Sequence, residues 1–529
     1  MTEPMRADLS GVDELTANLT HRVCVGDQSS RNAVVYGDRM ALIDGPTRIS
    51  YRELESLANA VGRGLRDLGV QRGDRVALAL QNRWEFVVTF FGCAKLGAIV
   101  VPLNVALMPA ELTFQLDDSG ASVLVTEQPL LALAEAAVRG TGVRDVRVVG
   151  AAPATVGDVP AAPWESLIAV DDSRLEVIVE DRDVLHCLYT SGTTSAPKGV
   201  LTSHVAVQLG ALSSALAFGL RADVDESVMP LVLPMFHVTA LDAILLSSLV
   251  TGMTVLLHRG FDPAAVAQNF VDHPVTHLTM LPAMWGALLQ QPALGQADTG
   301  RLVSGCYAMA PMPADLLAAL RARFPQAAFI LGSGQTETTP ASQMQWVGHQ
   351  GTKDDSWGPA VATTEVQVMG PDARLLERGQ EGEIVYRTPQ LMDGYWHNPE
   401  ANAESLAGGW FHGGDIGYLD EDGVVWFTDR SKDMVKTGGE NVSSVEVERI
   451  LLAHEAVAEC AVVGRPDERW GEAVTAYVVL GADTTATRDE LRAHCREHLA
   501  GFKVPKTIEL VDALPKTATG KIRKVELRG

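Results

Sequence analysis

The segment Tyr189–Gly199 brings hydroxyl residues, glycines and one lysine into a single stretch, Tyr-Thr-Ser-Gly-Thr-Thr-Ser-Ala-Pro-Lys-Gly. Small residues let backbone N–H groups approach a polyphosphate, hydroxyls donate hydrogen bonds to phosphate oxygens, and Lys198 can neutralise charge. The segment is not a Walker A loop, because Lys198 is neither preceded by Gly nor followed by Ser or Thr. A phosphate-binding loop is predicted here, and a flexible polar surface loop is the alternative.

Two other glycine-rich segments carry a carboxylate. Gly332–Thr338 (Gly-Ser-Gly-Gln-Thr-Glu-Thr) contains Glu337, and a carboxylate is a ligand type that Mg²⁺ prefers. Gly409–Asp415 (Gly-Trp-Phe-His-Gly-Gly-Asp) ends on Asp415, which can accept hydrogen bonds from both hydroxyls of a ribose. The purely structural alternatives are a tight turn ending in a helix cap for the first segment and a hairpin turn for the second.

Two further segments lie near the C-terminus. Residues 429–441 combine charged side chains with a Gly-Gly pair, a composition that suits a solvated connection able to rotate. Residues 515–524 are basic, and Lys521 follows Gly520 on a small-residue turn from which it could reach into a cleft. A plain linker and a basic tail are the respective alternatives.

Alternating helices and strands are predicted to position these segments. Ser50-Tyr51-Arg52-Glu53 has the form of a capping box, followed by apolar residues at helical spacing. Buried strands are predicted at 75–80, 98–103, 184–189, 232–233, 254–257 and 328–331, a rhythm typical of parallel sheets. Shorter β-like runs at 365–369, 383–386 and 424–428 predict a smaller β subdomain. A compact α+β unit follows, with helices from Ser443 and over 488–499 and strands at 461–463 and 476–480.

Composition excludes several classes of protein. The 529 residues are too many for one core at about 100–200 residues per domain. The net charge of −23 argues against nucleic acid and anionic membranes as main partners. The six cysteines are too sparse for a disulfide framework and lack metal-ligand spacing, and no transmembrane run or secretory signal is recognised. These features predict a cytoplasmic protein.

Taken in order, the five segments resemble the motifs of the adenylate-forming superfamily, which contains acyl-CoA synthetases, peptide-synthetase adenylation domains and firefly luciferase. The resemblance covers nearly the whole chain, including Ala94–Asn104, Leu233–His237, Gly382–Glu400 and Gly464–Glu472. Among the branches, the chain is most similar to bacterial fatty-acyl or aryl acid–CoA ligases.

This resemblance implies an α/β fold with two domains joined by a hinge. The N-terminal domain, 1–429, would contain parallel-sheet αβα subdomains and a small β subdomain over about 360–429. The hinge would be 430–432, with Lys432 at the pivot, and a small mobile α+β domain would occupy 433–529.

The resemblance also implies an activity and a set of residue roles. The enzyme would convert a carboxylic acid and ATP to an acyl-adenylate with release of pyrophosphate, then transfer the acyl group to CoA. Lys521 would bridge the carboxylate and the α-phosphate, Lys436 would act in the second step, and Glu337 would bind Mg²⁺. ATP and AMP would be bound by Thr190, Ser191, Gly192, Thr193, Thr194, Lys198, Ser333, Gly334, Thr336, Asp415 and Arg430. The acyl pocket would contain His237 as a gate, with Ala308, Met309, Ala310 and Gly332, and CoA would be bound by Gly438, Gly439, Trp470, Phe502 and Lys506.

Four positions depart from the motifs of the superfamily. Ser195 stands where Gly is usual, Ser333 where a Tyr usually stacks on adenine, and Gly413 where Thr or Ser is usual. Met309 lies in Ala-Met-Ala-Pro, where Gly-Gly-Ala-Pro usually leaves room for the acyl chain. Met309 would partly fill that space unless its flexible side chain folds aside. A short, branched or aromatic acid is therefore predicted rather than a long straight chain.

Several alternatives stay open at this point. The activated group could go to a carrier-protein thiol or an amine, or nitrite could be activated for diazotisation of an arylamine, and a homodimer is possible. A non-catalytic nucleotide-binding protein is an alternative of another class. A serine hydrolase is disfavoured because Gly-x-Ser-x-Gly does not occur.

Overall fold

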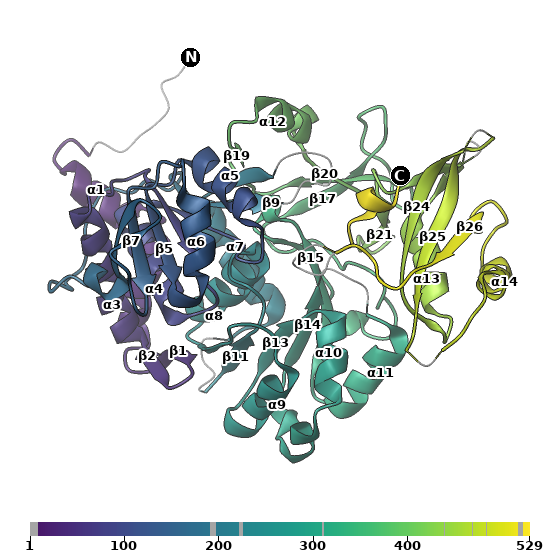
Figure 1. The fold of residues 1–529 in the computed structure, drawn as a ribbon, viewed down its shortest axis with the longest axis horizontal. Helices are drawn as coiled ribbons and strands as arrows, with labels where there is room; N and C mark the ends of the chain where they lie inside the picture. The colour runs from purple at the N-terminus through teal and green to yellow at the C-terminus, as the bar shows by residue number, and fades with distance from the viewer. Residues whose placement is uncertain are drawn as a thin grey trace. The chain divides into compact units, whose positions relative to one another are not determined.

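The computed structural model describes residues 9–190, 197–221, 226–308, 312–437, 440–467, 469–482, 484–516 and 522–528. The chain forms two compact units (Figure 1). Unit 1 contains residues up to Thr190, 197–365 and 387–402, and unit 2 contains 366–386 and 403–529. Unit 2 thus includes part of the predicted β subdomain, 366–386 and 403–429, together with the C-terminal residues. The boundaries at 429 and 432 remain predictions.

The largest sheet of unit 1 has nine strands in the order β19-β10-β9-β4-β3-β5-β6-β8-β7. Strands β3, β4, β5, β6, β8 and β9 run parallel, and β10 returns antiparallel to β9. This confirms the predicted parallel sheet. The bounds are β3 Arg75–Ala79, β4 Ile99–Pro102, β5 Val123–Glu127, β6 Asp145–Val149, β7 Thr155–Val156, β8 Val159–Pro163, β9 Val184–Thr190, β10 Lys198–Ser203 and β19 Gly394–Tyr395.

The described residues of unit 1 also form two four-stranded sheets. One has the order β11-β12-β1-β2 and the other β13-β14-β15-β16. The bounds are β1 Met40–Asp44, β2 Thr47–Ser50, β11 Val228–Leu231, β12 Thr254–Leu257, β13 His277–Met280, β14 Ser304–Ala308, β15 Ala328–Gly334 and β16 Ala341–Met344.

The strand predicted at Val232–Leu233 is wrong, since β11 ends at Leu231. The Leu233 carbonyl instead accepts a hydrogen bond from Asn82 Nδ2 at 2.8 Å, and Met235 N donates to Asn82 Oδ1 at 2.8 Å. The strand lies just before the predicted position and includes Pro230, which an edge strand tolerates.

Helix α3, Tyr51–Asp67, begins as the sequence predicts. The Ser50 hydroxyl accepts from Glu53 N while the Glu53 carboxylate accepts from Ser50 N, which completes the capping box. Helix α4, Trp84–Leu96, packs against α3 at Gly92, where an added Cβ would lie 3.0 Å from Gly62 N. The other helices are α1 Glu14–His21, α2 Gly26–Val35, α5 Pro109–Ser119, α6 Leu131–Val138, α7 His204–Phe218, α8 Ser247–Val250, α9 Pro263–Asp272, α10 Pro282–Leu289, α11 Ala314–Arg323 and α12 Pro399–Ser405.

Unit 2 contains two sheets. The antiparallel sheet β17-β18-β20-β21 consists of β17 Glu365–Met369, β18 Gly382–Arg387, β20 Phe411–Leu419 and β21 Val425–Arg430. The second sheet has the order β23-β22-β25-β24, with β26 beside β25, and Figure 1 shows its long strands with α13 and α14. Its elements are β22 Val435–Thr437, β23 Glu440–Val442, α13 Ser444–Leu452, β24 Val457–Asp467, β25 Gly471–Leu480, α14 Arg488–His498 and β26 Thr507–Leu510. The predicted α+β unit is confirmed.

All six cysteines are buried and unbridged. Burial raises the pKa of the Cys24 thiol to about 11 and that of Cys306 to about 12. No helix in the described ranges has both the length and the hydrophobicity needed to cross a membrane.

Candidate functional site

The strands around the predicted phosphate-binding segment form an antiparallel pair. β9 ends at Thr190 and β10 begins at Lys198, and these two residues face each other in register. Thr190 Oγ1 donates to the Lys198 carbonyl at 3.4 Å. The sheet therefore fixes the base of the segment, while the predicted Ser191, Gly192, Thr193 and Thr194 lie outside the described residues, as does Ser195.

Lys198, Tyr395 and Glu337 form a cluster in unit 1. The Lys198 Nζ atom lies 4.7 Å from the ring centroid of Tyr395, a cation–π arrangement. The Tyr395 hydroxyl donates to Glu337 Oε1 at 2.8 Å. All three residues are half-buried, so solvent can reach a cation and a carboxylate joined through one tyrosine.

Short backbone contacts bring the three residues together. β19 pairs with β10 in the register Val200–Tyr395, which places Tyr395 beside the start of β10. Met392 N donates to the Glu337 carbonyl at 2.8 Å. The segment at 392–395 thus holds both Lys198 and Glu337.

The chain before Glu337 is a strand as far as Gly334, and not the tight turn that was considered as the alternative for this segment. β15 continues through Gly334, and a Cβ at Gly334 would lie 1.6 Å from the Pro340 carbonyl oxygen, so only Gly fits. Ser333 pairs with Gln343 on β16, and Thr336 begins a short 3₁₀ helix over Thr336–Thr338.

A buried glutamine anchors this helix. The Gln390 side-chain Nε2 donates to the carbonyls of Thr338 at 2.7 Å and Ala341 at 2.8 Å. Thr363 Oγ1 donates to Gln390 Oε1 at 2.5 Å. Gln390 therefore fixes the backbone that carries Glu337.

The predicted acyl-pocket residues lie on two parts of unit 1. Ala308 and Gly332 face each other on the parallel strands β14 and β15. A Cβ at Gly332 would lie 3.2 Å from the Met344 methyl, so a side chain there would crowd its neighbours. His237 precedes the π-helix Thr239–Leu246, and its buried Nε2 has no partner among the described residues. Met309 and Ala310 lie outside the described residues.

His237 is a neutral imidazole at pH 7. Burial lowers the pKa of its ring to about 4, because the charged form would lose its hydration. The Phe236 and His237 rings lie 4.8 Å apart. This setting suits an uncharged polar group beside an apolar ligand.

Asp415 and Arg430 form an ion pair in unit 2. They face each other in register on β20 and β21, and Arg430 Nε lies 2.7 Å from Asp415 Oδ1. Asp415 is 1% exposed. The hairpin turn considered for Gly409–Asp415 is wrong, because β20 begins at Phe411 and carries Asp415 within the strand.

The residues around the predicted hinge form a turn and a short strand. Lys432 lies in the turn after β21, where Asp433 N and Met434 N both donate to the Arg430 carbonyl, at 2.8 and 3.0 Å. Lys436 is exposed on β22, and its backbone N donates to Glu472 Oε2 at 2.8 Å. Gly438, Gly439 and Lys521 lie outside the described residues.

The predicted CoA-binding side chains include a close aromatic–cation pair. Lys506 Nζ lies 5.6 Å from the Trp470 ring centroid, and the Arg469 guanidinium lies 4.6 Å from it. The Trp470 side chain is 36% exposed and the Phe502 side chain is 40% exposed. An exposed ring flanked by cations can stack on a base and neutralise a phosphate.

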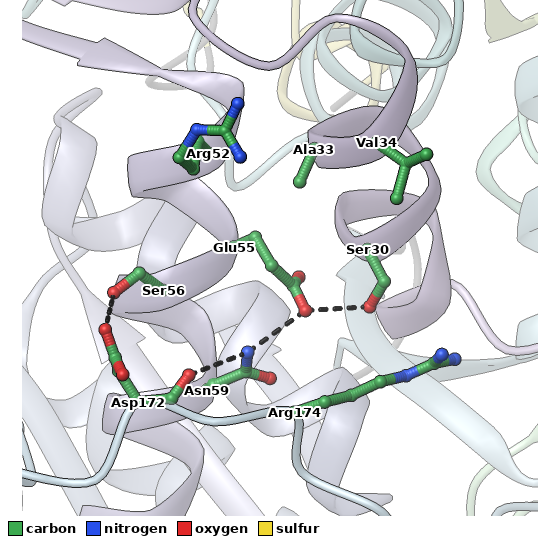
Figure 2. A pocket seen from close by; sticks show the side chains of 9 residues that line it. All are labelled: Ser30, Ala33, Val34, Arg52, Glu55, Ser56, Asn59, Asp172 and Arg174. Carbon is green, nitrogen blue, oxygen red and sulfur yellow. Dashed lines mark hydrogen bonds between the residues drawn. The ribbon is translucent and has the colours of Figure 1, made fainter.

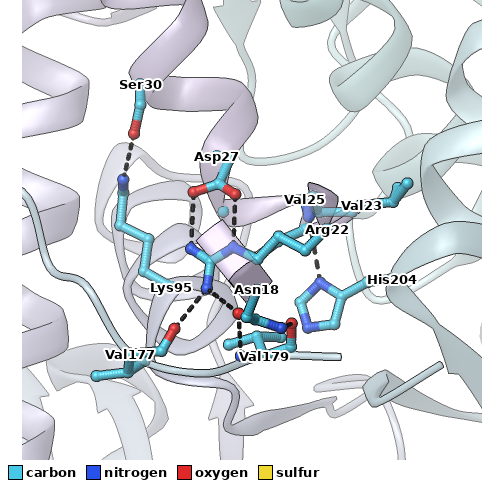
Figure 3. Close-up of polar contacts among 12 residues, drawn as sticks. Asn18, Arg22, Val23, Val25, Asp27, Ser30, Lys95, Val177, Val179 and His204 are labelled. Carbon is cyan, nitrogen blue, oxygen red and sulfur yellow. Dashed lines mark hydrogen bonds and ion pairs between the residues drawn. The ribbon is translucent and has the colours of Figure 1, made fainter. Parts of the chain in front are cut away.

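A second set of charges in unit 1 surrounds Lys95, a residue of the Ala94–Asn104 segment (Figure 3). Lys95 Nζ lies 2.8 Å from the Glu55 carboxylate and donates to Ser30 Oγ at 2.9 Å. Arg22 and Asp27 form a nearby ion pair with a 2.8 Å contact, and their side chains are 2% and 8% exposed. Burial lowers the pKa of Lys95. These charges are enclosed and bonded to one another.

Figure 2 shows a pocket whose lining includes Ser30 and Glu55 of this network. Glu55 accepts hydrogen bonds from Ser30 at 2.8 Å and Asn59 at 3.0 Å, and Ser56 donates to Asp172. No residue given a role by the sequence lines this pocket. Its lining residues are Ser30, Ala33, Val34, Arg52, Glu55, Ser56, Asn59, Asp172 and Arg174.

Sequence reasoning assigned no role to three residues that the structure adds to the candidate site. Tyr395 and Gln390 contact the Glu337 segment, and Arg469 lies over Trp470. Tyr395 belongs to the Gly-Tyr-Trp motif that carries part of the resemblance, so that motif could have pointed to it. No local pattern marks Gln390, because its partners lie about fifty residues earlier in the chain.

Comparisons with known proteins find matches over most of the chain. The model of the family described as AMP-binding enzyme matches residues 29–396, and that of the AMP-binding enzyme C-terminal domain matches 446–521. A feruloyl-CoA synthase of Amycolatopsis sp is 37% identical over 504 residues, 95% of this chain and 98% of the relative. The long-chain-fatty-acid–CoA ligase FadD13 of Mycobacterium tuberculosis is 34% identical over 487 residues, 91% of this chain and 93% of the relative. The structure of the Bacillus subtilis o-succinylbenzoate–CoA synthetase with ATP and magnesium has a TM-score of 0.82 and 29% identity, covering 95% of this chain and 99% of the other.

Proposed function

We propose roles for the site residues on the premise that this chain belongs to the family of AMP-binding enzymes. It is an AMP-forming acid–CoA ligase: it activates a carboxylic acid with ATP and transfers the acyl group to CoA. The identity of the acid and the work of each residue are the proposals that follow.

Lys198 and Glu337 serve the triphosphate. The single observation that carries this role is the Lys198–Tyr395–Glu337 cluster, which presents a cation and a carboxylate on fixed backbone within reach of solvent. Thr190 at the base of the loop and Thr336 beside Glu337 supply hydroxyl donors. The segment 191–196 adds backbone N–H groups and hydroxyls.

Magnesium fits the donors of this cluster. Mg²⁺ is usually bound through one or two carboxylates with phosphate oxygens, rather than by a full protein cage. Glu337 would hold the ion, and when bound the ion neutralises phosphate charge as pyrophosphate leaves.

Asp415 accepts hydrogen bonds from the ribose hydroxyls. The Asp415 carboxylate forms an ion pair with Arg430, and the paired strands β20 and β21 fix both side chains. Ser333 and Gly334 lie along the adenine, where Ser333 offers no aromatic face.

Lys521 serves the first half-reaction and Lys436 the second. Attack of a carboxylate on the α-phosphate brings two anions together, and Lys521 would stabilise the charge that accumulates. Rotation of the C-terminal domain at Lys432 would then move Lys521 away from the site and bring Lys436 to it. Exposure of Lys436 on β22 is consistent with a role at a surface that changes partners.

Trp470, Lys506 and Phe502 bind the nucleotide part of CoA, together with backbone at Gly438 and Gly439. The close approach of Lys506 to the Trp470 ring supports this role, because adenine stacking and phosphate neutralisation need both groups. Arg469 would add a second cation.

The acid is compact and aromatic. Met309 in place of a glycine favours a short acyl group, and the neutral, buried His237 suits an acyl group without charge. The 37% identity with a feruloyl-CoA synthase supports an aryl acid as the substrate. The 34% identity with a long-chain-fatty-acid–CoA ligase makes a long-chain fatty acid the competing class of substrate.

Pyrophosphate release and acyl-CoA formation test these proposals together. Hydroxycinnamic, benzoic, branched short-chain and long-chain acids would each be assayed with and without CoA. A kcat/KM for an aryl acid at least tenfold above that for a long-chain acid supports the proposed substrate class. The reverse order contradicts it.

Three further expectations need separate measurements. A cytoplasmic location follows from the need for ATP and CoA, and fractionation of the source cells would test it. A homodimer would be detected by mass in solution. A carrier protein as acceptor would be detected by acyl transfer to a phosphopantetheine-bearing protein in place of CoA.

A further inference from the structure

A buried histidine–aspartate pair joins strand β9 to the helix that follows His237. His186 on β9 and Asp242 on the π-helix are both fully buried, and His186 Nε2 lies 3.0 Å from Asp242 Oδ2. The pair is 56 residues apart in the chain. It contributes to none of the roles proposed above.

Stability does not account for this pair. Burying two ionisable groups removes both from water, and well-packed apolar side chains of similar size often stabilise a core at least as well. The second ring nitrogen, His186 Nδ1, and the second oxygen, Asp242 Oδ1, have no hydrogen-bond partner among the described residues. A buried pair that leaves two polar atoms without hydrogen bonds lowers the stability of the fold. The role of the pair therefore lies in the two elements that it connects, strand β9 and the π-helix.

Strand β9 is the fixed partner. It lies inside the nine-stranded sheet, bonded to β10 on one side and β4 on the other, and His186 itself faces Thr202 and Val100 in register. Four residues after His186 the strand ends at Thr190, at the base of the phosphate-binding segment.

The π-helix is the partner that needs fixing. π-helical turns are rare and occur mostly as short insertions at functional sites, because their wide turn packs poorly. Leu241 N donates to the His237 carbonyl at 3.0 Å, so His237 belongs to the turn that leads directly into Asp242. Asp242 is therefore well placed to set the position of His237.

We propose that His186 and Asp242 are positioning residues that hold His237 in place against the strand leading to the phosphate-binding segment. This inference rests on the proposed role of His237 at the acyl pocket. Loss of the pair would shift the acid without disturbing ATP, because β9 keeps its neighbouring strands whereas the π-helix loses its anchor.

The matched test compares Asp242→Asn with Asp27→Asn. Both remove the charge of a buried carboxylate with little change in shape, and Asp27 pairs with Arg22 outside the proposed site. Asp242→Asn should lower kcat/KM for the acid by about ten- to a hundredfold, the effect of a displacement of the order of 1 Å. It should change the KM for ATP less than about twofold, and Asp27→Asn should change neither constant. Equal changes for acid and ATP, or none, would overturn the proposal.

The double variant His186→Leu with Asp242→Leu separates positioning from stability. Two apolar side chains should restore the melting temperature to that of the wild type, because no buried group is left unpaired. The kcat/KM for the acid should stay low, since nothing now specifies the position of the π-helix. If the melting temperature and the kcat/KM for the acid both return to the wild-type values, the pair is purely structural and the proposal is wrong.

Backbone amide exchange gives a readout that does not depend on turnover. In Asp242→Asn, amides over residues 237–246 should exchange at least tenfold faster than in the wild type, while Asp27→Asn leaves them unchanged. Unchanged exchange in Asp242→Asn would overturn the inference. If the wild type releases no pyrophosphate with any acid, the proposed function fails, and the exchange data still decide whether the pair holds the helix.

Discussion

Unit 1 contains two clusters built from lysine and carboxylate, and they differ in how their charges are held. Lys198 and Glu337 are half-buried and joined through the face and hydroxyl of Tyr395. Lys95 and Glu55 are in direct contact at 2.8 Å, with side chains 2% and 14% exposed. In the first cluster the charged groups are accessible to a ligand. In the second cluster the lysine and the carboxylate neutralise each other inside the protein.

Both lysines belong to segments that resemble motifs of the same superfamily. Their residue types alone therefore do not distinguish a ligand-binding lysine from one that holds α4 against α2 and α3. The distinction comes from the partner: an aromatic ring leaves the ammonium able to bind a phosphate, whereas a buried carboxylate occupies it. Substitutions should accordingly affect activity in one cluster and stability in the other.

Lys95→Met should give the largest effect, and on stability alone. Removing the cation leaves the Glu55 carboxylate buried without a counter-charge, which typically costs about 3–5 kcal/mol. Denaturant unfolding would measure the loss, and kcat/KM per folded molecule should be unchanged. A fall in kcat/KM of more than tenfold with unchanged stability would show that Lys95 acts in catalysis or binding, and would contradict its assignment as a structural residue.

Lys198→Ala should show the opposite pattern. Loss of one preorganised donor to the triphosphate should lower the rate of adenylation by about 10²–10³-fold. The melting temperature should stay within a few degrees, because the side chain is half-buried and lies on a ring face. Pyrophosphate release would measure the rate of adenylation, and calorimetry on the same preparation would measure the melting temperature. A large fall in melting temperature would contradict the proposed role of Lys198 and indicate a structural one.

Tyr395→Phe should produce a smaller effect within the first cluster. The variant keeps the ring beneath Lys198 and removes the hydrogen bond to Glu337, so the KM for magnesium–ATP should rise by about tenfold, the cost of one hydrogen bond to a charged group. The KM for the acid serves as the internal control. An unchanged KM for magnesium–ATP would mean that Glu337 does not depend on this hydroxyl.

A buried neutral histidine should give the smallest effect, seen only in acid. Burial lowers the pKa of His204 to about 4, so between pH 6.5 and 4 the unfolded chain binds more protons than the folded one. Stability therefore falls as pH decreases, by about 1 kcal/mol between pH 6.5 and 5.5 for this residue. His204→Asn keeps an acceptor for the Val25 N–H and should reduce that slope in urea titrations. An identical slope would contradict the assignment.

The local elements could be predicted from the sequence because their signals are local. The capping box at Ser50 and the helix predicted over 488–499 depend on neighbouring residues. The capping box is confirmed, and the helix is confirmed with its end at His498. The strand error at Val232–Leu233 arose because Asn82, far away in sequence, takes the backbone hydrogen bonds there.

The site residues were identified by motif, but their contacts were not predictable. Lys198 meets Tyr395 only because β19 adds to the edge of the nine-stranded sheet beside β10. His186 and Asp242 carry no mark in a single sequence, since a lone histidine in an apolar strand indicates nothing until its partner is known. Such pairings depend on tertiary packing, and the roles assigned to the site residues remain proposals.

The burial of every cysteine makes the wild-type chain a ready background for site-specific labelling. The thiolate is the nucleophile that attacks a thiol-reactive dye, and these thiols are both enclosed and raised in pKa. A cysteine introduced on each side of the proposed hinge could therefore carry a donor and an acceptor dye without first removing native thiols. The distance between the two dyes could then be followed through one catalytic cycle, even with the free thiol of CoA bound in the same molecule.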